Sequence, residues 1–193
     1  MDPLSDFQIS FQHIALLVPR VNKGIQFILV ISGELKIETS NRFYHLKEKD
    51  LLVINRNQHY QVQGCEKNRV MIVTISDAFM DYHFTDYRNS RFECYSKEID
   101  LGREDMILSI RKLLVNVMIS YYRQDEIYRI EVKGYICQML LILIRGFKEE
   151  GSVLEKMDTD DLRLSQIIDY MEKNYDQLIT LEGIAKRFFL STG

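Results

Sequence analysis

The fold is decided by residues 24–76, which read GIQFILVISGELKIETSNRFYHLKEKDLLVINRNQHYQVQGCEKNRVMIVTIS. This stretch is a series of short apolar runs, each of which ends at turn-forming residues such as Gly, Asn, Asp or Ser. β-Branched and aromatic residues bounded in this way, at even spacing, are typical of antiparallel strands in a sandwich or barrel. Runs this short do not form stable helices, so the stretch predicts a small β-barrel.

Bulk composition excludes several classes of protein. Of the 193 residues, 46% are hydrophobic and 27% are charged, which is the balance of an ordinary globular protein. The net charge of −3 gives no overall basic footprint for nucleic acid. Three widely spaced cysteines, Cys65, Cys94 and Cys137, suit neither a disulfide framework nor a zinc site. Without a signal peptide or an apolar run that could span a bilayer, the sequence predicts a soluble, cytoplasmic protein with no membrane partner.

The segments beside the apolar stretch complete a predicted barrel at residues 1–99. Residues 1–12 are expected to be a polar arm, with the first strand at residues 10–18 and a turn at residues 19–23. After Ile75 the pattern loosens, and it predicts a short element followed by a last strand at residues 92–95.

A helical hairpin is predicted at residues 100–147. Apolar residues from Met106 to Tyr121 recur at spacings of three and four, which predicts one helix. A second helix is predicted at residues 127–147, and its middle is apolar on nearly every side. Such a helix must be covered on more than one face, either by the barrel alone or by a second copy of the chain. The second possibility predicts a homodimer, with an interface that contains Ile130, Cys137, Leu140, Leu141 and Ile144.

The C-terminal part carries the first resemblance to a known family. Residues 148–161 are acidic and predict a linker, and residues 162–191 read LRLSQIIDYMEKNYDQLITLEGIAKRFFLS. This string resembles the start of the helix-turn-helix domain of the AraC-type transcriptional regulators, at residues 162–193 here. The positions that carry the resemblance are Asn174-Tyr175, Ile179-Thr180-Leu181, Ala185 and Ser191. Thr180 and Ser191 are expected to cap helices, and the small Ala185 lets two helices pack closely.

The N-terminal part resembles the sensor half of the same family, a cupin-like barrel followed by a helical hairpin. The resemblance rests on Ile31-Ser32-Gly33, Leu46, residues 50–55 and His59. Lys49 departs from the pattern, because glycine is usual there. Together the two matches imply an α+β fold, with a cupin-like (jelly-roll) β-barrel, an α-helical hairpin and a truncated helix-turn-helix segment.

The resemblance also implies a function. The chain is expected to be the sensor and dimerisation portion of a DNA-binding transcriptional regulator, in which effector binding changes how the arm or the linker docks. Residues 161–193 contain four Lys and Arg against five Asp and Glu, and the recognition helix would begin only at Ser191. DNA is therefore the partner of the intact regulator and not of this fragment.

The candidate effector pocket follows from the family's usual pocket strands, with Leu46 taken as inward. It is expected to be lined by Ile28, Val30, Ser32, Tyr44, His59, Gln61, Met71 and Val73. An apolar wall with few polar groups favours a rather apolar small molecule. Alternatively, these residues simply fill the barrel, and the chain is a dimerisation module without a ligand.

An enzyme is the remaining alternative, because many cupins hold a catalytic metal. The chain has four histidines, His13, His45, His59 and His83, and none forms a His-x-His pair. Strand alternation turns His45 outward, so it does not converge with His59 on one metal. We therefore expect no metal, no cofactor, no catalytic residues and no enzymatic activity, while a metal-dependent cupin enzyme stays the rival hypothesis.

Overall fold

The structure is a computed structural model, and it describes residues 6–15, 18–40, 42–64, 67–100, 102–149, 167, 170, 171, 174 and 179–190. The chain divides into two compact units, residues 1–151 and residues 152–193. Within the described residues, no helix is both long enough and apolar enough to cross a membrane.

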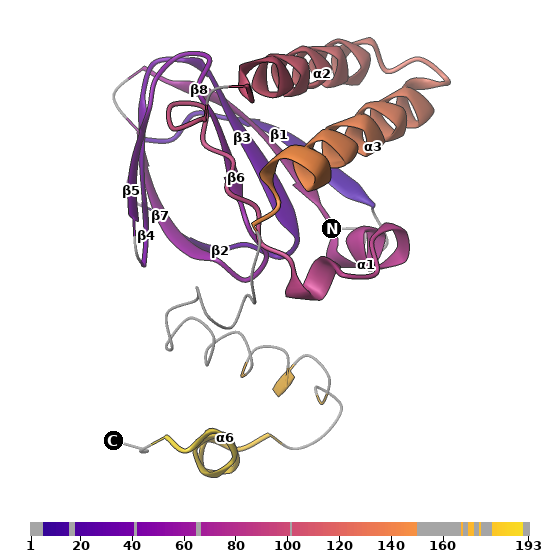
Figure 1. Cartoon of the computed structure of the whole chain (residues 1–193). Coiled ribbons are helices and arrows are strands. Elements are labelled where there is room, and N and C mark those ends of the chain that lie inside the picture. Colours follow the sequence, from indigo (N-terminus) through magenta and orange to yellow (C-terminus); the bar gives the residue numbers. More distant parts are fainter. Residues whose placement is uncertain are drawn as a thin grey trace. The chain divides into compact units, whose positions relative to one another are not determined.

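The first unit is built on two four-stranded antiparallel sheets (Figure 1). One sheet has the order β1-β8-β3-β6 and the other has the order β2-β7-β4-β5. The strands are β1 (Phe7–Gln12), β2 (Val18–Val21), β3 (Ile25–Ser32), β4 (Leu35–Thr39), β5 (Arg42–Leu46), β6 (Leu51–Ile54), β7 (His59–Gly64) and β8 (Arg69–Ile75). This order is that of an eight-stranded jelly roll, the architecture of the cupins, so the expected fold class is confirmed. The container consists of two facing sheets rather than a closed ring of strands.

Helices cover one face of the first sheet. Their bounds are α1 (Asp77–His83), the 3₁₀ helix η1 (Tyr87–Asn89), α2 (Glu104–Arg123) and α3 (Tyr128–Phe147). Figure 1 shows α2 and α3 lying side by side against the sheet that contains β1 and β3. The hairpin predicted at residues 100–147 is therefore present.

The central strands of this sheet are buried on both faces. Phe27 and Leu29 of β3 pack in the cluster shared with the helices, whereas Ile28 and Val30 pack in the cluster between the sheets. Because successive side chains of a strand point to opposite faces, a strand covered on both sides must be apolar at every position. This double burial explains the unbroken apolar run of β3.

The N-terminal segment differs from the prediction. Residues 7–12 were expected to be an arm, but they form β1, which pairs with β8 along its whole length from Phe7↔Ile75 to Gln12↔Val70. The predicted turn at residues 19–23 is also wrong in part, because residues 18–21 form β2. Pro19 is tolerated there because β2 is an edge strand.

Two asparagine side chains bind neighbouring backbone segments through a pair of hydrogen bonds, one donated and one accepted, as a peptide group does between strands. Asn55 donates to the carbonyl oxygen of Phe92 and accepts from its amide. Asn68 makes the same pair of bonds with Ile14. The predicted strand at residues 92–95 is absent, and this segment is held by the Asn55 bonds and by the isolated bridge between Tyr95 and Leu52.

Lys49 occupies the position where glycine is usual, and the structure gives the reason for that preference. Its φ is 69°, in the left-handed region that glycine adopts without strain. Its amide donates to the carbonyl oxygen of Val30, and Val30 in turn donates to Asp50. The turn is therefore formed with a lysine, at a cost of about 1–2 kcal/mol.

A matched pair of phenylalanines tests the location of the core. Phe27 is fully buried and Phe43 is 76% exposed, although both lie in strands of the same apolar stretch. We expect Phe27→Ala to lower the free energy of unfolding by about 3–5 kcal/mol and Phe43→Ala to change it by less than about 0.5 kcal/mol. Urea denaturation followed by circular dichroism measures both, and equal losses would contradict the described sandwich.

Candidate functional site

The space between the two sheets is filled by apolar side chains. Three predicted pocket residues, Ile28, Val30 and Tyr44, do point into this space. They pack there with buried residues of both sheets, among them Leu35, Ile37, Leu46, Leu52, Ile54, Val62, Val70 and Ile72. The middle of the sandwich is therefore core, and a ligand site must be sought nearer its edges.

Three other predicted pocket residues lie elsewhere. Met71 and Val73 belong to the cluster beneath the helices, because Val70 and Ile72 are the residues of β8 that face the second sheet. A shift of one residue exchanges the two faces of a strand, and β8 is too uniformly apolar to reveal its register. Ser32 is exposed, since the pairing of β3 with β8 is irregular between Val30 and Ser32.

The remaining two predicted residues line a pocket. His59 and Gln61 alternate on β7 with Tyr60 and Val62, which are buried between the sheets. A pocket of about 370 Å³ lies at β2, β4 and β7. Its described lining residues are Arg20, Glu38, Thr39, Ser40, His59, Tyr60 and Gln61. The structure thus brings His59 and Gln61 together with residues that the sequence did not single out.

A belt of polar side chains continues from this pocket along the inner faces of the edge strands. Arg20 donates to the side-chain oxygen of Gln12 at 2.8 Å, and Gln12 donates to Ser10 at 3.1 Å. By register, Arg20 lies opposite Tyr60, and Gln12 lies opposite Val70, so these side chains face the space between the sheets.

The same belt reaches the first sheet through Tyr60. Its hydroxyl donates to Gln26 at 2.8 Å, and Gln26 donates to Thr74 at 3.1 Å. Burial raises the pKa of Tyr60, and the neighbouring Arg20 partly opposes this rise, so the hydroxyl stays a neutral donor at physiological pH. Arg20 and Tyr60 belong to both the belt and the pocket, which makes this the most strongly polar part of the sandwich interior.

His59 has an unusual feature within this site. Its Nε2 atom is buried, and it has no hydrogen-bond partner among the described residues. An unsatisfied buried polar group costs on the order of 1–3 kcal/mol, so such groups are usually paired with a protein group, a water or a ligand.

The histidines do not gather around a metal. Among the described residues, no group of three or more His, Cys, Asp or Glu side chains is placed to hold a metal ion. His45 points outward and lies 2.8 Å from a carboxylate oxygen of Glu34, whereas His59 lies in the pocket. Burial raises the pKa of Cys94 to about 12, so this thiol is an inert core residue.

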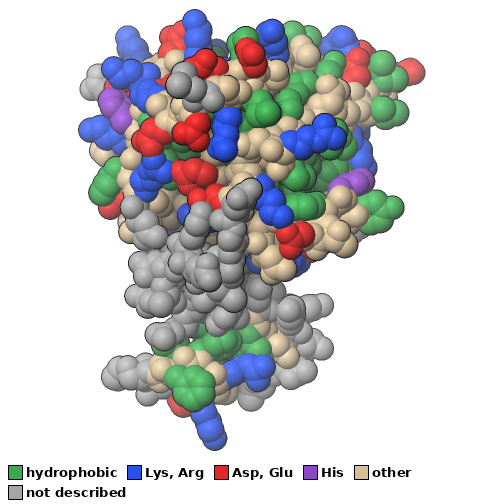
Figure 2. Space-filling view, viewed as in Figure 1, with side chains coloured by type: hydrophobic (Ala, Val, Ile, Leu, Met, Phe, Trp, Pro, Cys, Tyr) green, Lys and Arg blue, Asp and Glu red, His purple; other side chains and the backbone are tan. Residues whose placement is uncertain are grey.

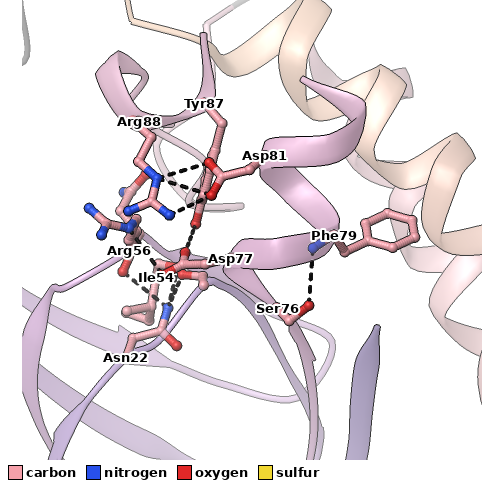
Figure 3. A network of polar contacts seen from close by, with 11 residues as sticks. Asn22, Ile54, Arg56, Ser76, Asp77, Phe79, Asp81, Tyr87 and Arg88 are labelled. Carbon is pink, nitrogen blue, oxygen red and sulfur yellow. Dashed lines mark hydrogen bonds and ion pairs between the residues drawn. The ribbon is translucent and has the colours of Figure 1, made fainter. Parts of the chain in front are cut away.

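A second polar cluster, shown in Figure 3, joins α1 and η1 to the turns of the sandwich. Tyr87 donates to one oxygen of Asp77 at 2.6 Å, and Arg56 donates to the other at 3.1 Å. The fully buried Asn22 donates to the carbonyl oxygens of Gly24, Ile54 and Asn55. Each of these donors ends on an acceptor within the protein, so the cluster stabilises the fold rather than forming a ligand site.

The predicted dimer residues on α3 separate into three groups by their burial. Leu140 is buried against the sheet within one chain, so its assignment to the dimer interface is wrong. Cys137 and Ile144 are partly buried against the same core. Ile130 and Leu141 are exposed and stay candidates for an interface.

The second unit is described around α6 (Leu181–Phe188). Thr180 caps this helix as expected, with its hydroxyl accepting from the amide of Gly183 at 3.1 Å, and Ala185 is buried. Tyr170 packs edge-on against Phe188, and Arg187 lies over the ring of Tyr170. Ser191 and most of the preceding predicted helix lie outside the described residues.

Tyr87 and Tyr82 provide a test of the cluster in Figure 3. Tyr87 is 1% exposed and burial raises its pKa, so its hydroxyl stays protonated and donates to Asp77. We expect Tyr87→Phe to lower the free energy of unfolding by about 1.5–3 kcal/mol, the usual value for a hydrogen bond to a charged group. Tyr82→Phe, at a residue that is 85% exposed, should leave the urea midpoint unchanged. A Tyr87→Phe protein as stable as the wild type would show that the bond to Asp77 contributes nothing.

Comparison with known proteins identifies the fold. No protein-family model and no curated protein matches the sequence. Among solved structures, ToxT from Vibrio cholerae matches with a TM-score of 0.51 and 14% identity, over 97% of this chain and 73% of ToxT. The AraC-like transcriptional activator CuxR matches with a TM-score of 0.56 and 11% identity, over 98% of this chain and 68% of CuxR. A cupin-2 domain protein from Shewanella frigidimarina matches 37% of this chain and 72% of its own, with a TM-score of 0.35 and 18% identity.

The likeness to ToxT and CuxR extends over nearly the whole chain. The jelly roll, the helical pair and α6 follow one another in the order that the sequence predicted. The chain therefore has the fold of the AraC-like transcriptional regulators.

Proposed function

We propose that this chain is the sensor and dimerisation part of a DNA-binding transcriptional regulator that acts in the cytoplasm and responds to a small molecule. The observation that carries this proposal is the likeness over nearly the whole chain to two AraC-like regulators. A further support is the capped helix α6, which agrees with the first helix that the resemblance implies for the family's helix-turn-helix motif. DNA recognition belongs to the intact regulator and would involve the recognition helix that the sequence resemblance implies after α6.

The rival functions make different demands on the sandwich. A metal-dependent enzyme needs converging ligands at the barrel wall, whereas His45 is engaged with Glu34 on the outer surface. Stoichiometric Fe, Mn, Ni or Zn in the purified protein would favour the enzyme. A dimerisation module without a ligand fits the filled middle of the sandwich, but it leaves the pocket at Arg20 and His59 without a role.

Dimerisation is proposed to use α2 rather than the residues first expected on α3. Exposed apolar side chains follow one face of α2 at intervals of seven, four and three residues: Leu108, Val115, Ile119 and Tyr122. This spacing is that of the contact stripe of a coiled coil. Two such stripes bury each other in a symmetric pair, and Ile130 and Leu141 of α3 would lie at its margin. Figure 2 shows Lys and Arg interspersed with Asp and Glu over the first unit, so the face in view presents no single-sign patch that would repel a second copy.

The signal is proposed to pass through β1, which contacts both the polar belt and the helices. Gln12 on its inner face accepts from Arg20, as described above. Phe11 on its outer face packs against the rings of Tyr121 and Tyr122 in α2, with ring centroids 5.4 and 5.1 Å apart. A ligand that engages Arg20 would compete with Gln12 and so bias the position of β1 against α2. This route replaces the free arm that the sequence predicted.

A transcriptional reporter tests the proposed function as a whole. Residues 1–193 are fused to a heterologous DNA-binding domain that represses its operator only as a dimer. We expect the fusion to repress, and we expect the Ile119→Glu fusion to lose at least tenfold in repression, because a buried charge at the stripe prevents pairing. A fusion that never represses, although it accumulates normally, would contradict the dimeric regulator.

The position of the interface has its own test. Sedimentation velocity compares Ile119→Glu with Leu141→Glu at protein concentrations of about 1–50 µM. This range spans the dissociation constant that corresponds to a free energy of association of about −7 kcal/mol. These residues are 53% and 51% exposed, so neither substitution should unfold the protein. We expect Ile119→Glu to be monomeric and Leu141→Glu to stay dimeric. The reverse result would place the interface on α3, where the sequence analysis put it.

A further inference from the structure

We propose that the pocket at β2, β4 and β7 binds a small organic acid, whose carboxylate is held by Arg20. This inference rests on the proposed sensor function and names the chemical class of its effector. The sequence had predicted an apolar effector in the middle of the sandwich. That space is filled by the apolar cluster of Ile28, Val30 and their neighbours, so we place the effector in the pocket at the edge instead.

The pocket is suited to a small ligand. Its volume of about 370 Å³ is at the lower end of the range of about 300–1,000 Å³ that is usual for small-molecule sites. The lining residues come from three strands of one sheet, paired in regular register from Val18↔Val62 to Thr39↔Tyr60. Hydrogen-bonded strands hold side chains in place better than loops do, so the site is preformed.

Arg20 is the cation that the pocket offers to a ligand. Its guanidinium group donates to Gln12 and lies beside the hydroxyl of Tyr60, which holds the side chain half-buried at the boundary of the belt and the pocket. A guanidinium group presents five donors in a planar fork that matches the two oxygens of a carboxylate. Partial burial strengthens this pairing relative to an exposed pair, because less water competes for the donors.

His59 supplies an independent indication of a ligand. Its buried Nε2 atom lacks a hydrogen-bond partner among the described residues, and the residue lines the same pocket as Arg20. His59 alternates with the buried Tyr60, so it lies on the other face of the sheet from Arg20, and a second polar group of the ligand or a water would satisfy its unpaired atom. The charge that favours an acid over a neutral molecule of the same shape is that of the Arg20 guanidinium group.

Glu38 opposes the binding of an anion, and its effect can be measured. This residue lines the pocket, but its side chain is exposed and points away from the space between the sheets. Its charge is therefore screened by water more strongly than that of Arg20. The removal of the Glu38 charge should tighten the binding of an acid, whereas the removal of the Arg20 charge should weaken it.

The experiment uses the full chain and two pairs of isosteric probes. Benzoate and hexanoate carry a carboxylate, while benzamide and hexanamide have the same shapes without a charge. Binding is measured by isothermal titration calorimetry and by the shift in melting temperature at a probe concentration of about 10 mM, where stabilisation follows mass action. We expect at least one acid to bind and to raise the melting temperature, and we expect its amide to bind at least tenfold more weakly.

Three variants assign the effect to the pocket. Arg20→Gln should weaken binding of the acid at least tenfold, Arg20→Lys should weaken it less, and Glu38→Gln should strengthen it by about twofold or more. Arg69→Gln removes one positive charge from an exposed position of β8 and serves as the control that leaves binding unchanged. The circular dichroism spectrum of each variant shows whether it is folded.

The unfavourable outcomes distinguish a failure of the organic-acid site from a failure of the proposed regulatory function. If the acids do not bind, if the amides bind as well as the acids, or if Arg20→Gln binds as tightly as Arg69→Gln, the organic-acid site is overturned. A reporter fusion that still represses as a dimer leaves the regulatory function standing in that case. If the fusion never represses while the acid still binds through Arg20, the proposed function fails and the site survives as that of another protein class.

Discussion

The structure depends on the burial of one sheet on both of its faces. Strands β3 and β8 lie between the helical pair and the second sheet, and their middle residues, 27–30 and 70–73, are all apolar and buried. Burial of apolar surface contributes about 25 cal/mol per Å², so two covered faces give these strands the largest share of the stabilisation. Because of the same constraint, the polar functional groups lie on the edge strands of the sandwich, where the side chains between the sheets are not fully buried.

The two open sides of the sandwich are closed in different ways. At the side of β5 and β6, Tyr95 packs edge-on against Tyr44 and donates to the carbonyl oxygen of His45, so this side is sealed by an aromatic contact. At the side of β1 and β2, the closing groups are Ser10, Gln12 and Arg20, which are polar and partly accessible. A site that exchanges ligand with solvent requires such a side, because polar groups are desolvated and resolvated there at lower cost than in an apolar core.

Strand β1 has a composition that suits a coupling element. Its outward residues, Phe7, Ile9 and Phe11, pack against the cluster beneath the helices, while its inward residues are polar. As an edge strand it pairs with β8 alone, so fewer bonds hold it than hold β3. A shift of β1 therefore costs less than a shift of any central strand, and it would be felt both at Arg20 and at the tyrosines of α2.

By itself, the sequence determined most of the elements and their order, but not the strands β1 and β2. The short apolar runs and their turns predicted β3, β4, β5, β6 and β8, helical periodicity predicted α2 and α3, and the capping residue Thr180 marked the start of α6. These features depend on local interactions, namely turn chemistry, side-chain periodicity and the capping of amides.

Only the tertiary structure decided which side of each element is functional. Met71 and Val73 face the helices, because alternation disappears from a strand that is buried on both sides, and Ser32 is exposed by an irregularity in pairing that no local pattern marks. In the site, Gln12 meets Arg20 through a hydrogen bond between the two sheets, and Arg20 lies close to His59 through the pairing of β2 with β7. Such proximity is a property of the register between strands, and the register is set by how the whole sandwich packs.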